Sequence, residues 1–274
     1  MTANPFLDTD RVRHDLYADA GRIAQRTGAL SRAKTAGPHP ATVIADLAAT
    51  VIADLAATGL PGTVLDIGCG RGTTTLALAE RLDPPRLIAF DQSTALLAEA
   101  RSRLTGRLGV EFLRGDFHAI DLPNSSVAVA VAAFCLYHSP RPAAVIAEIA
   151  RCLAPGGLSI TVTKSPDSYR TLDEVIAASG LDPEATSRPS LYETFHSHNQ
   201  ADIVGTCLDV QQVIHHEHRF RFTDADHIAE YAATNPKYQL GGDVAQIARR
   251  LRETVGNGPL ETSSTVTYVV AARR

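Results

Sequence analysis

The feature that most constrains the fold is a glycine-rich turn between a short apolar run and a helical pattern. The run Thr63-Val-Leu-Asp-Ile67 continues into Gly68-Cys-Gly-Arg-Gly72, and residues 73–82 have helical spacing. Glycines at such a bend let the backbone turn tightly and approach a ligand, and the helix that follows presents N–H groups at its N-terminus. The order strand, glycine turn, helix predicts a ligand site at the carboxyl edge of a parallel sheet.

Strand and helix patterns alternate beyond this turn. Further strands are expected at 86–91, 110–114, 127–134 and 158–164, with helices at 93–104 and 142–153. This alternation predicts an α/β fold with a doubly wound, Rossmann-like sheet, mostly parallel. Two final strands, at 210–222 and 264–271, lack a clean crossover unit and predict an antiparallel C-terminal hairpin. The expected sheet has seven strands.

The patterns divide the chain into four segments. Residues 1–59 are expected to form an N-terminal helical cap, and residues 60–164 the ligand-binding core. Residues 165–208 are polar and weakly patterned, as is typical of a substrate-side insertion. Residues 209–274 are expected to complete the same core.

A tandem repeat falls at the end of the expected cap. Residues 42–49 (TVIADLAA) recur directly as residues 50–57. Eight residues are not a helical period, and true repeat architectures need longer units. Two interpretations remain open, a slip that lengthened an alanine-rich helix and a duplicated partner-binding face.

Composition excludes several classes of protein. A net charge of −4 gives no general electrostatic affinity for nucleic acid or an anionic membrane. No apolar run approaches the 18 residues of a membrane span, and the first residues lack a secretory pattern. The four cysteines are scattered and form no C-x-x-C pair, which favours reduced thiols and a cytoplasmic protein.

Two aspartates flank the glycine turn. Asp66 lies two residues before Gly68, and Asp91 ends the second expected strand, 21 residues after Gly70. A carboxylate at the end of that strand can accept both hydroxyl protons of a ribose. Asp66 disfavours a pyrophosphate and suits an ammonium or sulfonium group, and the G-x-G-x-G spacing differs from the dinucleotide fingerprint. The ligand is therefore expected to carry adenosine and a positive centre.

These motifs resemble those of the class I S-adenosylmethionine (SAM)-dependent methyltransferases. The matching segments are 64–72, 90–93, 115–117, 133–138, 148–157 and the closing strand at 265–271. The resemblance is nearest to the small-molecule branch with ubiquinone and menaquinone C-methyltransferases and antibiotic-tailoring enzymes. The Asn/Asp-Pro-Pro-Tyr motif of amino- and base-methylating members is absent at 134–138.

The resemblance implies SAM as cofactor and S-adenosyl-L-homocysteine (SAH) as product. It implies that Asp116 holds the adenine amino group while Phe117 packs on the ring. The expected cofactor-binding residues are Asp66, Gly68, Cys69, Gly70, Gly72, Asp91, Gln92, Asp116, Phe117 and Phe134.

Catalytic candidates lie just past the fourth core strand. His138 is the first candidate, either as a general base, since an imidazole has a pKa near 6.5, or as a substrate contact. A helix cap or a loop hydrogen bond is the structural alternative. Tyr137 or Phe134 could face the sulfonium, and strand alternation would put Phe134 and Leu136 on one face. Tyr17 is a candidate for a lid over the site.

The remaining histidines gather in two places. His196 and His198 fall in the insertion and could line a substrate pocket. A second group at 215, 216 and 218 lies on an expected strand, where a solvated edge face is favoured over a metal site because no ligand spacing is completed. No metal is therefore expected.

The sequence thus predicts an enzyme that transfers the methyl group of SAM to a small-molecule acceptor at O, N or C, in secondary-metabolite or antibiotic biosynthesis. The transfer is an in-line displacement. The alternatives are a nicotinamide-dependent oxidoreductase and a non-catalytic, SAM-binding assembly protein. Neither nucleic acid nor membrane is expected as a partner, and the protein is expected to be a monomer or a homodimer.

Overall fold

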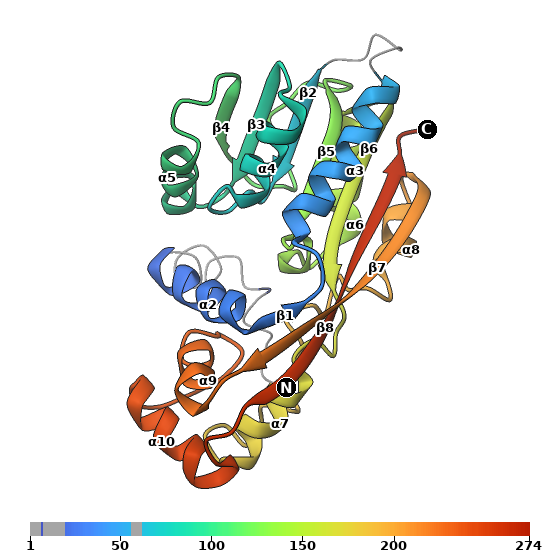
Figure 1. Ribbon diagram of the computed structural model, residues 1–274. Coiled ribbons are helices and arrows are strands. Elements are labelled where there is room, and N and C mark those ends of the chain that lie inside the picture. Colours follow the sequence, from blue (N-terminus) through green and yellow to red (C-terminus); the bar gives the residue numbers. More distant parts are fainter. Residues whose placement is uncertain (1–6, 8–19, 56–61) are drawn as a thin grey trace. The chain divides into compact units, whose positions relative to one another are not determined.

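The computed structural model describes residue 7, residues 20–55 and residues 62–274 (Figure 1). Its α-helices are α2 (Ala20–Ala33), α3 (Pro40–Leu55), α4 (Thr73–Leu82), α5 (Thr94–Arg103), α6 (Pro142–Cys152), α7 (Arg170–Ala178), α8 (Gln200–Gly205), α9 (Ala225–Ala232) and α10 (Val244–Val255). Its strands are β1 (Lys34–Ala36), β2 (Thr63–Ile67), β3 (Arg86–Asp91), β4 (Val110–Arg114), β5 (Val127–Ala133), β6 (Leu153–Lys164), β7 (Asp209–Phe222) and β8 (Leu260–Ala272).

The chain forms two compact units. Residues 1–37, 165–193 and 216–265 make up unit 1, and residues 38–164, 194–215 and 266–274 make up unit 2. Strands β7 and β8 run from one unit into the other. The segment at 165–208, expected as one insertion, contributes α7 to unit 1 and α8 to unit 2.

Unit 2 contains the expected parallel sheet. Its strands follow the order β7-β8-β6-β5-β2-β3-β4, and β2, β3, β4, β5 and β6 pair in parallel (Figure 1). At the centre, Leu65 of β2 lies opposite Ile88 of β3 and Ala130 of β5. These three side chains are buried, which explains why the central strands are apolar on both faces.

Helices cover both faces of this sheet. Ile160 and Val162 of β6 belong to the main hydrophobic cluster with residues of α3 and α4. Because side chains alternate along a strand, Thr163 points to the opposite face, where its hydroxyl donates to the Phe195 carbonyl at 2.8 Å. Helices α6 and α8 contact each other, and α6 also contacts β6. The doubly wound prediction is confirmed.

The antiparallel prediction is confirmed at β8. This strand pairs antiparallel with β6, with Ile160 opposite Val270 and Thr163 opposite Thr267. The described residues hold eight strands rather than the seven expected. The additional strand is β1, which pairs antiparallel with β7 in unit 1 through Lys34 and Phe220. Three residues are too few to show a strand period in the sequence.

Unit 1 has a hydrophobic core of its own. Its buried residues include Ala29 of α2, Ile176 of α7, Phe222 of β7, Ile228 of α9 and Leu251 of α10. Helix α10 begins with a capping box in which Asp243 and Gln246 bond each other's backbone N–H groups.

One expectation for β7 is wrong. His218 was expected on a solvated edge face, but it is only 3% exposed. It lies against Gly37 (φ +96°), where an added Cβ would come within 2.7 Å of the imidazole. The glycine therefore leaves room for the histidine ring to be buried, which a strand period alone cannot reveal.

The repeat of residues 42–57 falls largely within one helix. Helix α3 includes the whole first copy and residues 50–55 of the second, while residues 56 and 57 lie outside the described part. Ile44, Ala45 and Ala48 of the first copy are buried in the main cluster of unit 2. The first copy thus has a packing role in the core.

Candidate functional site

The glycine turn after β2 has three left-handed glycines, at φ +64°, +55° and +77° for Gly68, Gly70 and Gly72. A Cβ on Gly68 would lie 2.5 Å from Cys135 Cβ, and one on Gly72 would lie 3.0 Å from Ala100 Cβ. In the part of the chain that the structure describes, a Cβ on Gly70 would meet nothing within 4 Å. The outer glycines are therefore required by packing, and the middle one has an open side that a ligand can approach.

Asp91 is held directly against this turn. Its Oδ2 accepts a hydrogen bond from the Gly70 N–H at 2.9 Å, and its Oδ1 accepts one from the Ser93 N–H at 2.8 Å. Ser93 in turn caps helix α5 by accepting from the Leu96 N–H. Burial raises the pKa of Asp91, and the backbone donors partly offset that rise. A carboxylate has about four acceptor positions, so these bonds leave acceptor capacity on Asp91.

Asp66 is buried behind the turn. The side chain is 1% exposed, and its Oδ2 accepts a hydrogen bond from the Thr75 hydroxyl at 2.6 Å. Loss of hydration raises its pKa to about 7, although the Thr75 bond opposes the rise. A cation bound nearby would favour the ionised carboxylate. The sequence did not indicate a role for Thr75, because its hydrogen bond to Asp66 depends on where the first turn of α4 lies.

The expected adenine-side residues follow β3 and β4. Gln92 is half-buried, and its carbonyl accepts from Arg114 Nε at 3.3 Å. Asp116 is exposed, whereas Phe117 is half-buried with its ring centroid 4.8 Å from that of His118. The residue before them is Gly115. An added Cβ at this position would lie 2.5 Å from Phe90 Cζ, so packing favours glycine here. Asp91 is the last residue of β3, and Asp116 lies two residues after the end of the neighbouring strand β4.

Strand β5 ends differently from the prediction. Phe134 is not in the strand but has a left-handed backbone, φ +56°, which costs a non-glycine residue about 1 kcal/mol. Leu136–His138 then form a 3₁₀ turn, so the expected strand alternation of Phe134 and Leu136 is wrong. The Lys164 ammonium lies 5.5 Å from the centroid of the Phe134 ring, a cation contact that the sequence did not reveal.

The 3₁₀ turn carries two of the three expected catalytic residues, Tyr137 and His138. Tyr137 is 6% exposed, and its carbonyl accepts from the Thr194 hydroxyl at 3.1 Å. Its ring meets the half-buried His138 ring edge-on, with centroids 4.6 Å apart. Tyr17, the expected lid residue, lies outside the described part of the chain.

The two histidines of the insertion lie together in unit 2. The Nδ1 of His196 accepts from the His198 N–H at 3.2 Å, and their ring centroids are 5.5 Å apart. Burial, together with the His198 charge, lowers the pKa of His196. Within the described residues, no group of three or more His, Cys, Asp or Glu could hold a metal ion. No described helix is both long and apolar enough to cross a membrane.

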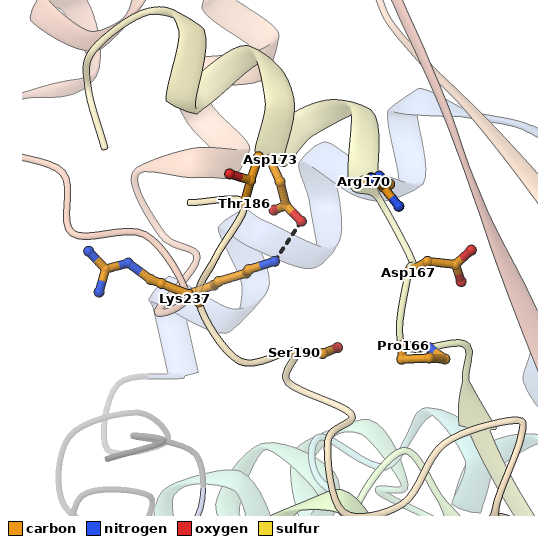
Figure 2. Close-up of a pocket in the computed structure, with 8 residues that line it drawn as sticks. Pro166, Asp167, Arg170, Asp173, Thr186, Ser190 and Lys237 are labelled. Carbon is orange, nitrogen blue, oxygen red and sulfur yellow. Dashed lines mark hydrogen bonds and ion pairs between the residues drawn. The ribbon is translucent and has the colours of Figure 1, made fainter. Parts of the chain in front are cut away.

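A polar pocket of about 360 Å³ lies within unit 1 (Figure 2). At one side the Lys237 ammonium contacts the Asp173 carboxylate at 2.5 Å, and the Tyr238 hydroxyl also donates to Asp173. Most of the lining comes from the segment expected to be the substrate-side insertion. The lining residues are Pro166, Asp167, Arg170, Asp173, Thr186, Arg188, Ser190 and Lys237.

The glycine turn, Asp91 and Asp116 lie in the region that matches a known protein family. Residues 64–157 match the family described as a methyltransferase domain. Malonyl-[acyl-carrier protein] O-methyltransferase from Xylella fastidiosa is 29% identical over 132 residues, which are 48% of this chain and 45% of that protein. Trans-aconitate 2-methyltransferase from an Acidovorax species is 37% identical over 108 residues, 39% of this chain and 40% of that protein.

The likeness to solved structures extends over more of the chain. The YcgJ protein from Bacillus subtilis has a TM-score of 0.53 and 19% identity, covering 82% of this chain and 98% of that one. At that identity the likeness shows the fold, and it confirms the Rossmann-like expectation. The chain spans less than half the length of the two curated relatives.

Proposed function

We propose that this protein transfers the methyl group of SAM to a small-molecule acceptor. One observation carries the proposal, the hydrogen bond from the Gly70 N–H to Asp91 Oδ2. It joins the glycine turn and the strand-end carboxylate, whose sequence patterns independently indicate an adenosine ligand. The open side of Gly70 and the buried carboxylate of Asp66 fit a cofactor with a positive centre.

Five of the expected residues have a role in this proposal. When bound, SAM supplies an electrophilic methyl group on a sulfonium, which an acceptor atom attacks in line while SAH leaves. Asp91 binds the ribose hydroxyls, and Asp66 stabilises the positive end of the ligand across the turn. Asp116 accepts from the adenine amino group, and Phe117 packs on the base. His138 removes a proton from a hydroxyl or acidic carbon acceptor.

The first test is SAH binding, measured by isothermal titration calorimetry. Wild-type protein should bind SAH, and Asp91→Ala should bind at least tenfold more weakly, because two charge-assisted hydrogen bonds are lost. The matched control is Asp121→Asn, an exposed carboxyl outside the site. No SAH binding by the wild type would refute the proposal, and a fluorescence change with a reduced nicotinamide cofactor would replace it with the oxidoreductase.

The polar pocket of unit 1 suits an ionised small-molecule ligand. Among the described residues, its lining has three cationic and two anionic side chains and no aromatic ring. The relatives' names refer to malonyl-[acyl-carrier protein] and to trans-aconitate, both carboxylates. We therefore propose an ionised small-molecule acceptor, and place the reaction in secondary metabolism because the motifs resemble those of antibiotic-tailoring enzymes.

A kinetic comparison tests the pocket. Arg170 is chosen because its side chain is 76% exposed and its loss should leave the fold intact. With SAH release measured over a panel of carboxylic and aromatic acceptors, Arg170→Gln should raise KM for the acceptor several-fold and leave the SAH affinity unchanged. Arg249→Gln, an exposed arginine outside the pocket, is the control. Equal KM values for the two variants would remove the pocket from the acceptor site.

A further inference from the structure

A chain of three side chains links the loop after β4 to the turn after β5. His118 Nδ1 lies 2.7 Å from Asp116 Oδ1, and His118 Nε2 lies 2.8 Å from the Ser139 hydroxyl oxygen. Ser139 is fully buried, and the His118 side chain is 24% exposed. All three residues belong to unit 2. The imidazole therefore bridges a surface carboxylate and a buried hydroxyl.

The direction of these bonds follows from the chemistry of the groups. An ionised carboxylate can only accept hydrogen bonds. His118 Nδ1 is therefore protonated and donates the hydrogen bond that Asp116 accepts. The same Oδ1 also accepts the backbone N–H of His118 at 2.9 Å. At the other end, Ser139 Oγ accepts the Arg141 N–H at 2.9 Å and can donate its own proton to His118 Nε2. The tautomer with the proton on Nδ1 satisfies every member.

These hydrogen bonds restrict the rotation of the Asp116 side chain, although the side chain is exposed to solvent. The carboxylate is 46% exposed, and a half-exposed aspartate would normally change rotamer readily in water. Here two donors converge on one oxygen, and the ring that supplies one of them is itself fixed to a buried side chain. The hydrogen bond to Ser139 thus fixes the His118 ring, and the ring in turn fixes the plane of the Asp116 carboxylate. In the same way, outer hydrogen bonds orient the residues that bind a metal ion.

We propose that His118 is a positioning residue for nucleobase recognition, holding the Asp116 carboxylate in the orientation that accepts the 6-amino group of adenine. This inference rests on the proposed function, which assigns adenine to Asp116. His118 itself need not touch the cofactor. Ser139 acts through His118 and should have the smaller effect, because its loss leaves the bonds between His118 and Asp116 intact.

The test compares SAH with S-inosyl-L-homocysteine, which has a 6-oxo group in place of the amino group. His118→Ala should weaken SAH binding about tenfold and leave the weaker inosyl analogue nearly unchanged, so the preference for adenine falls. Added imidazole should restore part of the SAH affinity. His215→Ala is the control, because it also loses one imidazole hydrogen bond, to the Thr267 hydroxyl, outside the site.

A double-variant cycle separates positioning from simple loop stability. If His118 acts through Asp116, then Asp116→Ala combined with His118→Ala should bind SAH no more weakly than Asp116→Ala alone. Additive losses, equal weakening of both analogues, or an unchanged SAH preference in His118→Ala would each overturn the proposal. Should Asp116→Ala lose the preference while His118→Ala keeps it, only this inference fails. Absence of SAH binding by the wild type overturns the proposed function as well.

Discussion

Replacement of Asp66 by asparagine should make the protein less sensitive to pH. The carboxyl is buried, and its pKa is raised from 3.8 to about 7 by loss of hydration. A folded-state pKa above the unfolded value means that ionisation disfavours folding. The penalty begins as the pH rises above the unfolded pKa near 3.8 and is complete above pH 7. Asparagine keeps an oxygen that can accept from Thr75 and has no charge.

The expected change in unfolding free energy follows from the difference between the folded and unfolded pKa values of Asp66. A shift of about 3 pKa units corresponds to about 4 kcal/mol of unfolding free energy at alkaline pH. About 1.5 kcal/mol of this penalty is present at pH 5, so about 2.5 kcal/mol develops between pH 5 and pH 8. Asp91, whose pKa is also raised by burial, is present in both proteins and cancels in the comparison.

Urea unfolding of the ligand-free protein at pH 5, 6, 7 and 8 measures this difference. Asp66→Asn should gain about 2.5 kcal/mol relative to the wild type between pH 5 and pH 8. Any constant cost of burying the amide appears at every pH and drops out. Asp121→Asn, at an exposed carboxyl, should run parallel to the wild type. If Asp66→Asn also ran parallel, the carboxyl would not change its ionisation on folding, and the reasoning from burial would be wrong.

Four further substitutions have effects that the structure predicts. Gly68→Ala should lower the unfolding free energy by about 3 kcal/mol, because a strained backbone and a clash with Cys135 combine. Gly70→Ala should lower it by about 1 kcal/mol, and its main effect should be weaker SAH binding, measured by calorimetry. Asp173→Asn should lower the unfolding free energy by about 2–3 kcal/mol in urea unfolding, since Lys237 is left without its carboxylate in a largely buried position. His138→Ala should reduce kcat about 100-fold or more without changing the SAH Kd; an unchanged kcat would exclude the base.

The parts of the fold that the sequence predicted are those set by local periodicity. Alternating apolar strands and helices indicated the parallel sheet, and the glycine turn indicated the loop between β2 and α4. The approach of Asp91 to Gly70 was also within reach, because the carboxyl ends of parallel strands meet at one edge. These features depend on residues close to one another in sequence or on neighbouring strands.

Other parts depend on packing between distant residues and were missed. Phe134 has a left-handed backbone that no apolar pattern announces. The bonds from His118 to Ser139 join residues 21 positions apart through side-chain orientation alone. His218 is buried because a glycine lies beside it, and a strand period does not contain that information. Positions of this kind need three-dimensional coordinates.

The course of β8 affects how the protein is made. In unit 2 this strand is internal, with β6 on one side and β7 on the other, yet it follows both of them in chain order. A ribosome therefore releases β2 to β7 before the strand that separates β6 from β7 exists. Until it arrives, the hydrogen-bonding edge of β6 is unpaired and open to intermolecular strand pairing. Slow translation of the codons for β8 should therefore expose nascent chains to aggregation or chaperone capture.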